Sequence, residues 1–388
     1  MIVVAWVLVG LAALYFGAIA SVAVAARRDI EVLADLPVPE LTHWPRLSVI
    51  TPARDEAAGL EKALRSKLTS TYPALELVAV DDRSKDGTGA IIDALAAEDS
   101  RVRAVHVTEL PAGWLGKLNA LQRGKEAATG EWLLFTDADI HFTPDALTRA
   151  VGYVERRGLD FLAVFPDLWP SGVLVDAGIT ALMRSLSLGM RKRAAENPKS
   201  RMAVGGGVFN LVRRAALDRS AGLADLKMEV IDDIGLAQMI KRSGGKCSVA
   251  NAQGLVGLHF YRSVGEMIRA SEKNAYGAAG RFELKRLLPF VTLFFLLEWS
   301  PFWAIACGGA LRWAGVGLLV LDYGGALAFT AWMRRPLLSA LLTPVGATIG
   351  IWAALRAAYL TTLHGGISWR ETFYSLEDLR KGRRFTIC

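Results

Sequence analysis

The sequence predicts an α/β domain with a mainly parallel sheet, together with N- and C-terminal transmembrane helices. Charged residues are absent from residues 1–26 and sparse in residues 287–363, whereas the remainder has the charge content of a soluble domain. Between these regions, short apolar runs alternate with longer helical stretches. We expect four segments: an N-terminal transmembrane helix (1–28), the α/β domain (46–285), a C-terminal membrane region (287–363) and a basic tail (364–388).

The composition excludes several classes of protein. Hydrophobic residues make up 52% of the 388 residues, which excludes intrinsic disorder. The three cysteines are scattered without the spacing of a zinc site or a disulfide scaffold. Part of the net charge of +7 lies beside the apolar stretches, at Arg27, Arg28, Arg281, Lys285 and Arg286. This placement favours a membrane with acidic headgroups over nucleic acid as the partner.

The first apolar stretch is long enough to cross a bilayer. At 1.5 Å per residue, residues 2–26 span a hydrocarbon core of about 30 Å. The run is too long for a signal peptide, and no basic region precedes it. Because Arg27 and Arg28 follow the span, we expect the α/β domain to be cytoplasmic and the protein to be a multi-pass protein of the cell inner membrane.

The C-terminal membrane region contains three apolar segments, 287–311, 313–333 and 337–363. Two prolines and Glu298 interrupt the first segment, so we expect it to be re-entrant or interfacial and to leave two true spans. Glu298, Asp322 and Arg356 lie inside apolar segments, where an unpaired charge is costly. Two explanations stay open: contact with an acceptor headgroup or a proton path, and mutual pairing or placement at the interface.

Five apolar runs are expected to form strands, and four helices are expected between them. Runs that are apolar on both faces and alternate with helices are typical of a parallel sheet covered by helices. The strands are RLSVITPA, LELVAVDD, VRAVHVTE, EWLLFTDAD and DFLAVFPD, and the helices are 57–70, 87–99, 116–129 and 143–157.

Acidic residues follow three of these strands, where ligands of such sheets collect. They are Glu56 after the first strand, Asp81 and Asp82 at the end of the second, and Asp137 and Asp139 after the fourth. Like charges repel unless a cation lies between them, and Mg²⁺ or Mn²⁺ bridges carboxylates to phosphates. We therefore expect a divalent metal here.

The Asp137-Ala138-Asp139 triplet is the best single indication of that metal. In a continuing strand, residues two apart point to the same face, so both carboxylates could converge on one ion. A turn or a helix cap is the alternative explanation. Asp82 is similarly ambiguous, because it could cap backbone amides or accept the imide N–H of a uracil.

Five motifs in order, TPARDE, DDRSKDGT, LFTDADI, GGGVFNLVRR and VIDDIGLAQMIKRSG, resemble those of family-2 glycosyltransferases with the GT-A fold. The similarity covers about residues 46–285. The flanking apolar spans, the GWLGKLNALQRG segment and the WRETFY tail resemble the membrane-bound subgroup that glycosylates lipids, which includes hopanoid-associated, carotenoid and ceramide glycosyltransferases.

The resemblance implies roles for particular residues. Asp82, with Asp81, would read the nucleotide base, and Pro52, Ala53 and Glu56 would line the nucleoside pocket. Lys117 and Asn119 would lie near the donor, although solvated helix residues are the alternative. Asp139 would be the direct metal ligand and Asp137 would lie closer to the ribose and donor sugar. Gly205, Gly206 and Gly207 would form a wall of the acceptor pocket, or simply a tight turn.

The resemblance also implies a catalytic base. Asp233 would take the proton of the acceptor hydroxyl, with Asp232 in support, although capping of the following helix is the alternative. The Gln-x-x-Arg-Trp sequence of processive relatives is absent, which favours transfer of one sugar per acceptor. Arg262, Arg269 or Lys273 would then stabilise the departing diphosphate.

The expected function is therefore inverting transfer of a sugar from a nucleotide-diphospho-sugar, with UDP as the expected nucleotide, to a lipid hydroxyl at the cytoplasmic face. The enzymatic alternatives are a polysaccharide synthase and a polyprenyl-phosphate glycosyltransferase. The non-catalytic alternative is a subunit that binds a nucleotide sugar.

Overall fold

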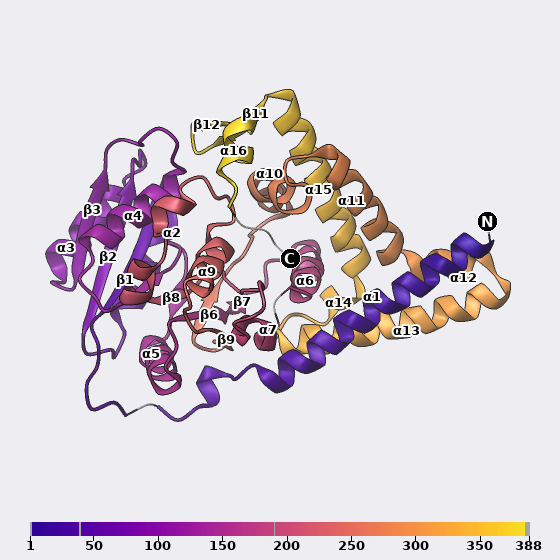
Figure 1. Ribbon diagram of the computed structural model, residues 1–388, viewed down its shortest axis with the longest axis horizontal. Helices are drawn as coiled ribbons and strands as arrows, with labels where there is room; N and C mark the ends of the chain where they lie inside the picture. The colour runs from indigo at the N-terminus through magenta and orange to yellow at the C-terminus, as the bar shows by residue number, and fades with distance from the viewer. Residues whose placement is uncertain (1, 39, 190, 385–388) are drawn as a thin grey trace. The chain divides into compact units, whose positions relative to one another are not determined.

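The computed structural model describes residues 2–38, 40–189 and 191–384, and the chain divides into two compact units. Of the described residues, the sheet unit comprises those within 30–167, 192–258 and 382–384. The helical unit comprises the described residues within 2–29, 168–191 and 259–381. Figure 1 shows the two units as a region of strands and helices and a region made almost wholly of helices. The chain passes from one unit to the other five times.

A seven-stranded sheet forms the centre of the sheet unit, in the order β3-β2-β1-β4-β8-β6-β9. Every neighbouring pair is parallel except the two that involve β8, which runs antiparallel to β4 and β6. The structure thus confirms the α/β class with a mainly parallel sheet. The strands are β1 (Leu47–Ala53), β2 (Leu75–Asp82), β3 (Val102–Val107), β4 (Trp132–Phe135), β6 (Phe161–Phe165), β8 (Asn210–Arg213) and β9 (Cys247–Asn251).

Helices connect these strands, as the alternating pattern predicts. Helices α3 and α4 pack on β1, β2 and β3. The helices of this unit are α2 (Ala57–Leu68), α3 (Thr88–Glu98), α4 (Gly116–Ala127), α5 (Ala146–Arg157), α7 (Lys192–Glu196), α8 (Arg214–Arg219) and α9 (Asp232–Arg242), with 3-10 turns at Leu33–Asp35 and Leu223–Leu226. Two short strands, β5 (His141–Phe142) and β10 (Val256–Leu258), pair antiparallel beside the main sheet, and β7 (Asp167–Leu168) lies at the boundary of the units.

The core of this unit is apolar on both faces of the sheet. Leu47, Val49 and Ile50 of β1 are fully buried, as are Trp132 of β4 and Phe161 of β6. Burial of about 0.8 kcal/mol per methylene group explains why these β-branched and aromatic runs form interior strands. Because both faces of the sheet are buried, its strands need the runs, apolar on both faces, that the sequence shows.

One local expectation for the sheet is wrong. The sequence predicts that the fourth strand continues through Asp139, but β4 ends at Phe135 and residues 138–139 form a turn. The polypeptide leaves the sheet after Thr136, whose N–H still donates to the Ile50 carbonyl at 3.2 Å. A turn, and not the alternation of a strand, therefore orients the two carboxylates of the triplet.

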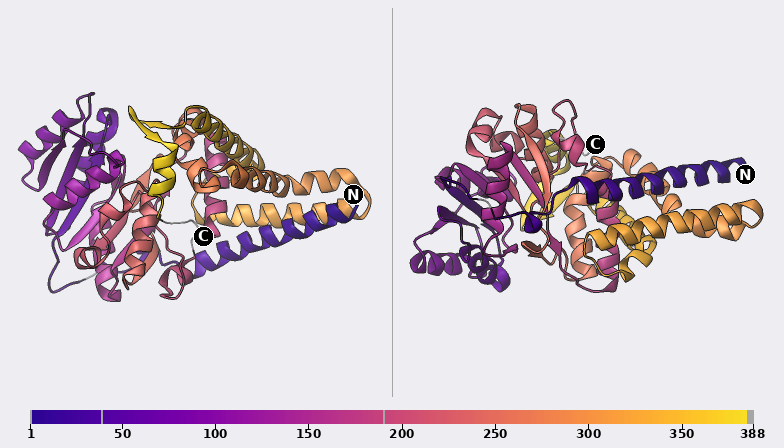
Figure 2. Two further views of the ribbon diagram at one scale, coloured as in Figure 1. Left: turned by 45° about the horizontal axis from the view of Figure 1, so that its top comes forward. Right: turned by 90° about the horizontal axis from the view of Figure 1, so that it is seen from below.

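The helical unit contains two long apolar helices that lie side by side, α1 (Ile2–Asp29) and α13 (Gly309–Trp332). Figure 2 shows them adjacent in both views. The remaining elements of this unit are α6 (Val173–Ser187), α10 (Val264–Gly280), α11 (Leu284–Glu298), α12 (Ser300–Cys307), α14 (Leu338–Leu341), α15 (Thr343–Leu363), the hairpin β11 (Gly366–Trp369) and β12 (Thr372–Ser375), and α16 (Leu376–Gly382).

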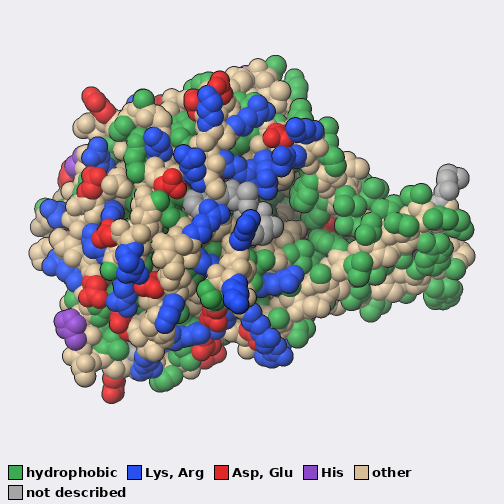
Figure 3. Space-filling view, viewed as in Figure 1, with side chains coloured by type: hydrophobic (Ala, Val, Ile, Leu, Met, Phe, Trp, Pro, Cys, Tyr) green, Lys and Arg blue, Asp and Glu red, His purple; other side chains and the backbone are tan. Residues whose placement is uncertain are grey.

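Among the described residues, α1 and α13 are the two single helices that are long and apolar enough to cross a membrane. Helices α11 and α12 meet at a bend of 59° and together fit a broken span or a re-entrant loop. The segment expected at 337–363 is divided into α14 and α15, with Pro344 in the first turn of α15. The side chains that cover α1 and α13 in the view of Figure 3 are largely hydrophobic. Leu14 of α1 and Trp313 of α13 are each about three-quarters exposed. Surfaces of this kind are typical of contact with lipid.

The charges inside the apolar segments are paired. Arg184 of α6 is fully buried and forms ion pairs with both Glu298 of α11 and Asp322 of α13. Tyr15 of α1 donates a hydrogen bond to Glu298 at 2.7 Å, and Arg356 pairs with Glu272 of α10. Each of the three charges is therefore paired, but with Arg184 or Glu272 as the partner and not with one another as mutual pairing would require.

Candidate active site at the carboxyl ends of the strands

The strand ends of the sheet unit bring the predicted acids to one edge. Strand β1 is parallel to β2 on one side and to β4 on the other, so the carboxyl ends of the three strands meet. In this register Ala53 lies beside Asp81, the first acid at the end of β2. Asp137 follows β4 by two residues, and its N–H donates to the Gly207 carbonyl at 3.1 Å. The edge therefore collects side chains from distant parts of the chain, as the rule for parallel sheets requires.

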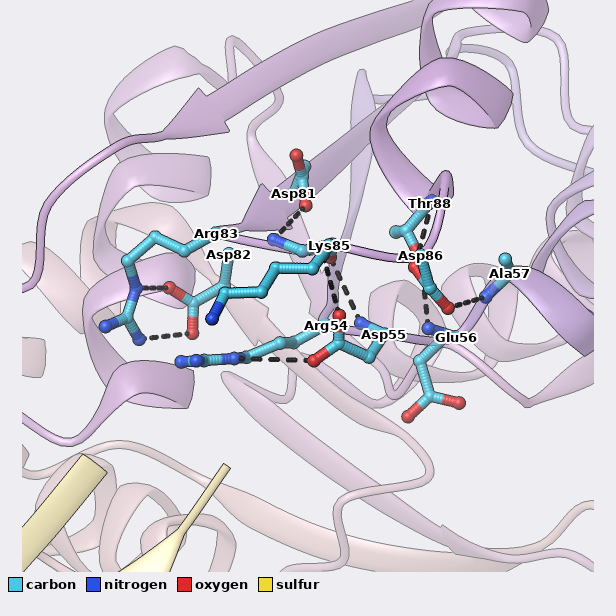
Figure 4. Close-up of polar contacts among 11 residues, drawn as sticks. Arg54, Asp55, Glu56, Ala57, Asp81, Asp82, Arg83, Lys85, Asp86 and Thr88 are labelled. Atoms are coloured by element: carbon cyan, nitrogen blue, oxygen red, sulfur yellow. Dashed lines mark hydrogen bonds and ion pairs between the residues drawn. The ribbon is translucent and has the colours of Figure 1, made fainter. Parts of the chain in front are cut away.

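Asp82 is held by the residue that follows it. Its carboxylate accepts two hydrogen bonds from the Arg83 guanidinium, at 2.8 Å from Nε and 3.1 Å from Nη2 (Figure 4). Arg83 adopts a left-handed backbone conformation with φ of 60°, which turns its side chain back toward Asp82. Asp82 is buried, so this bidentate pair satisfies a carboxylate that would be costly to leave unpaired.

Asp81 has different partners from Asp82. One oxygen accepts the Ser84 N–H at 3.1 Å, and the other lies 3.3 Å from the His106 ring. His106 also contacts Asp93 at 2.8 Å, and the hydrogen bonds to Asp93 and Asp81 outweigh partial burial and raise the pKa of His106. Asp81 thus fixes the turn after β2, and of the two neighbouring acids Asp82 is the one placed beside α4.

Hydrogen bonds from backbone N–H groups to side-chain oxygens join the loop after β1 to the loop after β2. Asp55 accepts the Lys85 N–H at 2.8 Å, and Asp86 accepts the Ala57 N–H at 3.0 Å (Figure 4). The Glu56 N–H donates to the Thr88 hydroxyl at 2.9 Å, while Figure 4 shows the Glu56 carboxylate turned away from this contact. Pro52 and Ala53 end β1 directly before this loop. The residues expected to line a nucleoside pocket therefore lie on a segment that these hydrogen bonds attach to the loop after β2.

The first turn of α4 connects Asp82 with the remaining acids. A Cβ atom at Gly116 would lie 2.7 Å from a carboxylate oxygen of Asp82, so glycine permits this close approach. The next residue, Lys117, forms ion pairs with Asp137 at 2.8 Å and with Asp232 at 3.4 Å. Burial opposes the charge of Lys117, but the carboxylates of Asp137, Asp232 and Asp233 outweigh it and raise the pKa of the ammonium.

Asp233 lies in the first turn of α9 with both oxygens engaged. The Gly207 N–H donates to one oxygen at 3.0 Å, and the Ile234 N–H donates to the other at 2.8 Å. Desolvation by the surrounding protein, together with the charge of Asp232, raises the pKa of Asp233. Each oxygen retains a second lone pair, so the carboxylate can still accept a substrate proton.

A small cavity lies among these groups. Its wall includes the ion pair of Lys117 and Asp137, the acids at the start of α9, and the glycine loop before β8. The lining residues are Lys117, Leu118, Leu121, Phe135, Thr136, Asp137, Gly207, Asn210, Leu223, Leu226, Asp232, Asp233 and Leu236. Motif residues from four separate parts of the sequence thus line one cavity.

The glycines at 205–207 differ in their surroundings. A Cβ atom at Gly205 would lie 2.1 Å from the Asp233 carbonyl oxygen, and one at Gly207 would lie 2.7 Å from an Asp137 carboxylate oxygen. Nothing lies within 4 Å of the corresponding position at Gly206. The first and third glycines therefore allow the loop to pack against two of the acids, and the second does not serve this purpose.

The acids fit a hard divalent cation. Although the Asp139 side chain is exposed, the surrounding protein desolvates its carboxylate and, with the charges of Asp137 and Glu56, raises its pKa to about 6. A nearby cation would reverse that rise. Among the described residues no three acidic, histidine or cysteine side chains are already grouped as a metal site. Two carboxylates completed by phosphate oxygens and water is an arrangement that Mg²⁺ commonly adopts.

Asn119 lies near Lys117 on α4 and is nearly fully buried. Its amide nitrogen has no hydrogen-bond partner among the described residues. Arg262 and Arg269 belong to the helical unit, where Arg262 is exposed and its N–H donates to Glu266 at 2.9 Å. Lys273 lies on α10 in the same unit, and its side chain is outside the part of the chain that the structure describes.

Two residues of the site were not singled out from the sequence. Arg83 holds Asp82, and Gly116 allows α4 to approach it. Each is adjacent to a residue that was singled out, Asp82 and Lys117 respectively. Their position next to these residues was the only indication in the sequence that they belong to the site. The left-handed conformation of Arg83 depends on the loop between β2 and α3.

Residues 48–220 match the model of glycosyl transferase family 2. The putative teichuronic acid biosynthesis glycosyltransferase TuaG of Bacillus subtilis is 30% identical over 122 residues, which are 31% of this chain and 47% of that protein. The GalNAc(5)-diNAcBac-PP-undecaprenol beta-1,3-glucosyltransferase of Campylobacter jejuni is 32% identical over 104 residues, or 27% and 33% of the two chains. This chain therefore spans less than half the length of each of these curated relatives.

Among solved structures, the mannosyltransferase PcManGT of Pyrobaculum calidifontis, in complex with GDP-Man and Mn²⁺, superimposes with a TM-score of 0.55 at 22% identity. The alignment covers 92% of this chain and 98% of that chain. This similarity shows the fold, which is the expected GT-A fold. The match to the model of glycosyl transferase family 2, at residues 48–220, covers most of the seven-stranded sheet.

Proposed function

We propose that this protein is a membrane-anchored inverting glycosyltransferase that moves a sugar from a UDP-sugar to a lipid hydroxyl at the cytoplasmic face. The single observation that carries the proposal is the cavity where Lys117, Asp137, Asp232 and Asp233 meet. Structural acids are rarely gathered around one cavity, because their mutual repulsion destabilises the fold. A site that binds a cation or transfers a proton explains why these charged side chains are gathered around one cavity.

Asp233 is the proposed general base. An acceptor hydroxyl has a pKa far above neutrality, so a carboxylate within hydrogen-bond reach takes its proton as the new bond to the anomeric carbon forms. The raised pKa of Asp233 makes it a stronger base than an exposed aspartate. The two backbone N–H groups hold its oxygens in fixed positions, which reduces the reorganisation needed during transfer.

The donor would lie across the ends of β1, β2 and β4. Asp82 would accept the imide N–H of uracil, and Lys117 and Asn119 would approach the donor from α4. Asp137 and Asp139 would hold a divalent ion, with Asp139 as the direct ligand, and Mg²⁺ or Mn²⁺ supplies positive charge to the departing diphosphate when bound. The complex of PcManGT with GDP-Man and Mn²⁺ supports a metal-assisted donor site on this fold.

The lipid acceptor is proposed from the helical unit. Helices α1 and α13 are long and apolar enough to cross a bilayer, and their outer faces are hydrophobic. The relative from Campylobacter jejuni is named for an undecaprenol-linked substrate, which supports an acceptor carried on a lipid. Confinement of donor site and acceptor to one surface lowers the entropic cost of their encounter. Arg262 or Lys273 is the proposed cation for the leaving diphosphate.

The test of this proposal is the Asp233→Asn variant, purified in detergent. We expect its turnover with a lipid-alcohol acceptor to fall by about 10²- to 10⁴-fold, because the general base is lost. UDP binding, measured by calorimetry in the presence of Mn²⁺, should stay within about twofold of the unmodified protein, since Asp233 is not a proposed donor ligand. Asp218→Asn is the matched control, because Asp218 is exposed and pairs with Lys125.

Three outcomes would contradict the proposal. Unchanged turnover in Asp233→Asn would show that Asp233 is not the general base. Full activity after exhaustive EDTA treatment would show that the reaction does not need a divalent metal. A product with a long glycan, seen by mass spectrometry of the lipid fraction, would show that the enzyme synthesises a polymer and does not transfer a single sugar.

A further inference from the structure

A lysine is buried beneath the proposed metal site. Lys67 has no exposed surface and lies on the inner face of α2, where the other buried positions are Leu60, Ala63 and Leu64. The helical period requires an apolar residue at such a position. Burying a lysine is far more costly than burying a methionine or leucine, so its presence needs a compensating contact.

The contacts of Lys67 lead to the segment that carries Asp139. Its Nζ donates a hydrogen bond at 2.6 Å to the carbonyl oxygen of Ile140, the residue directly after Asp139 in the chain. A weaker contact to the Ala63 carbonyl spans 3.4 Å, and the ammonium lies 5.4 Å from the centre of the Phe142 ring. Burial lowers the pKa of Lys67 to about 7, against the opposing charges of Asp139 and Asp137.

A second residue of α2 holds the same segment. The Phe142 N–H donates to the Ser66 hydroxyl at 3.2 Å. On the other side of the turn, the Asp137 N–H is bonded to the Gly207 carbonyl. Ala138 and Asp139 therefore lie between two anchored points, and the anchor that Lys67 supplies, at Ile140, is adjacent to Asp139 in the chain.

We propose that Lys67 is a positioning residue, which holds the Ile140 carbonyl and so fixes the turn that presents Asp139 to a divalent ion. The inference rests on the metal site of the proposed function. Lys67 itself would touch neither ion nor substrate. Groups that orient a metal ligand without binding the metal commonly change metal affinity by 10- to 100-fold when they are removed.

The experiment compares full-length wild-type protein with Lys67→Met, which keeps the length and fills the apolar face but removes the donor. Lys62→Met is the matched control, because Lys62 is exposed on the same helix. Mn²⁺ affinity is measured by electron paramagnetic resonance in the presence of UDP. Hydrogen exchange of the peptide covering residues 136–143 is measured without metal, and melting temperature is measured for each variant.

For Lys67→Met we expect Mn²⁺ affinity to fall at least tenfold and exchange in 136–143 to quicken, with both unchanged in Lys62→Met. Unchanged exchange and affinity in Lys67→Met would overturn the inference, as would a lower melting temperature with wild-type Mn²⁺ affinity, which marks a packing residue. If Lys67→Met does not fold, Lys67→Leu is judged by the same measurements. If the wild-type protein binds no Mn²⁺ with UDP, the proposed metal site fails, whereas the exchange rates still decide whether Lys67 holds this segment.

Discussion

Three aspartates of similar intrinsic acidity, Asp82, Asp137 and Asp139, receive different properties from their neighbours. Asp82 is neutralised by a bidentate guanidinium, and Asp137 shares the Lys117 ammonium with Asp232. Asp139 has a pKa raised to about 6. The surroundings of each aspartate therefore distinguish the proposed roles of nucleobase recognition, donor contact and metal binding, although the side chain is the same at each position.

The raised pKa of Asp139 predicts a pH dependence of metal binding. A carboxyl group with a pKa of about 6 is ionised at pH 7.5 and mostly protonated at pH 5. Protons then compete with the metal, so we expect apparent Mn²⁺ affinity to fall by about tenfold between pH 7.5 and pH 5. Calorimetric titration at several pH values measures this. The decline should begin near pH 6 as the pH is lowered, and a decline that begins only near pH 4 would contradict the raised pKa.

The stability of the metal-free protein should fall as pH rises, whereas the affinity for Mn²⁺ should increase. Because the folded state binds the Asp139 proton more tightly than the unfolded state, this residue lowers the free energy of unfolding as pH rises from 4 to 6. Asp139 is exposed, so solvent screening limits the effect to less than about 1 kcal/mol. The Asp139→Asn variant should lose this contribution and bind no Mn²⁺.

At the scale of elements, the loop at 205–207 packs against the start of α9 with no room for side chains at two positions. Gly205 lies against the backbone of Asp233, and Gly207 lies against the carboxylate of Asp137. The contact at Gly205 involves backbone atoms, which cannot move aside as a flexible side chain can. The loop and the helix are therefore positioned by each other.

Gly205→Ala should displace the first turn of α9 and with it Asp233. We expect turnover to fall by about 10²-fold, because a shift of about 1 Å in a catalytic group has an effect of this size. Gly206→Ala is the matched control, since no atom lies within 4 Å of the added carbon, and it should retain turnover within about threefold. Comparable turnover of the two variants, measured under saturating donor, would show that the close packing at Gly205 does not govern the site.

Most elements of the sheet unit could be predicted from the sequence, because their signals are local. The runs at β1, β2 and β6 are apolar on both faces, and the helices between the strands have the expected period. The antiparallel direction of β8 could not be predicted, since strand direction depends on partners far away in the chain. The early end of β4 has the same cause, because the bond from Asp137 to Gly207 draws the chain out of the sheet.

The candidate site was predictable as a set of residues and less so as a set of contacts. The strand ends indicated Asp82, Asp137 and Asp139, and the family resemblance indicated Asp233. The partner of each depends on side chains that converge only in the folded chain, such as Lys117 between two acids. Lys67 gave no signal, because a lysine on a helix is ordinarily solvated and only the packing of α2 shows that it is buried.

At the scale of the whole chain, one buried arginine joins three stretches that are far apart in the sequence. Arg184 lies in the 168–191 stretch, Tyr15 and Phe16 in the N-terminal helix, and Glu298 and Asp322 in the C-terminal region. All belong to the helical unit. Two carboxylates and a tyrosine around one guanidinium specify which apolar helices pack together, where apolar contacts alone discriminate poorly.

Arg184→Met should destabilise the helical unit by about 3–5 kcal/mol, because it leaves two buried carboxylates without a cation. Simultaneous replacement of all three charges, as Arg184→Met, Glu298→Leu and Asp322→Leu, should restore much of that loss. Thermal unfolding in detergent, followed by tryptophan fluorescence, measures both effects. Arg312→Met is the control, because Arg312 is exposed on α13. If the triple variant is no more stable than Arg184→Met, uncompensated charge is not the cause.

The place of β8 in the sheet has a consequence during protein synthesis. Strand β4 ends at residue 135 and needs β8, which starts at residue 210, to cover its second edge. At about 5–20 residues per second, a ribosome needs roughly 4–15 s to make the intervening chain, which includes α6. During that interval the nascent polypeptide carries an open, apolar strand edge that can pair with other chains. Slow translation or a lack of chaperones should therefore cause aggregation at this stage, before the acids of the site have met.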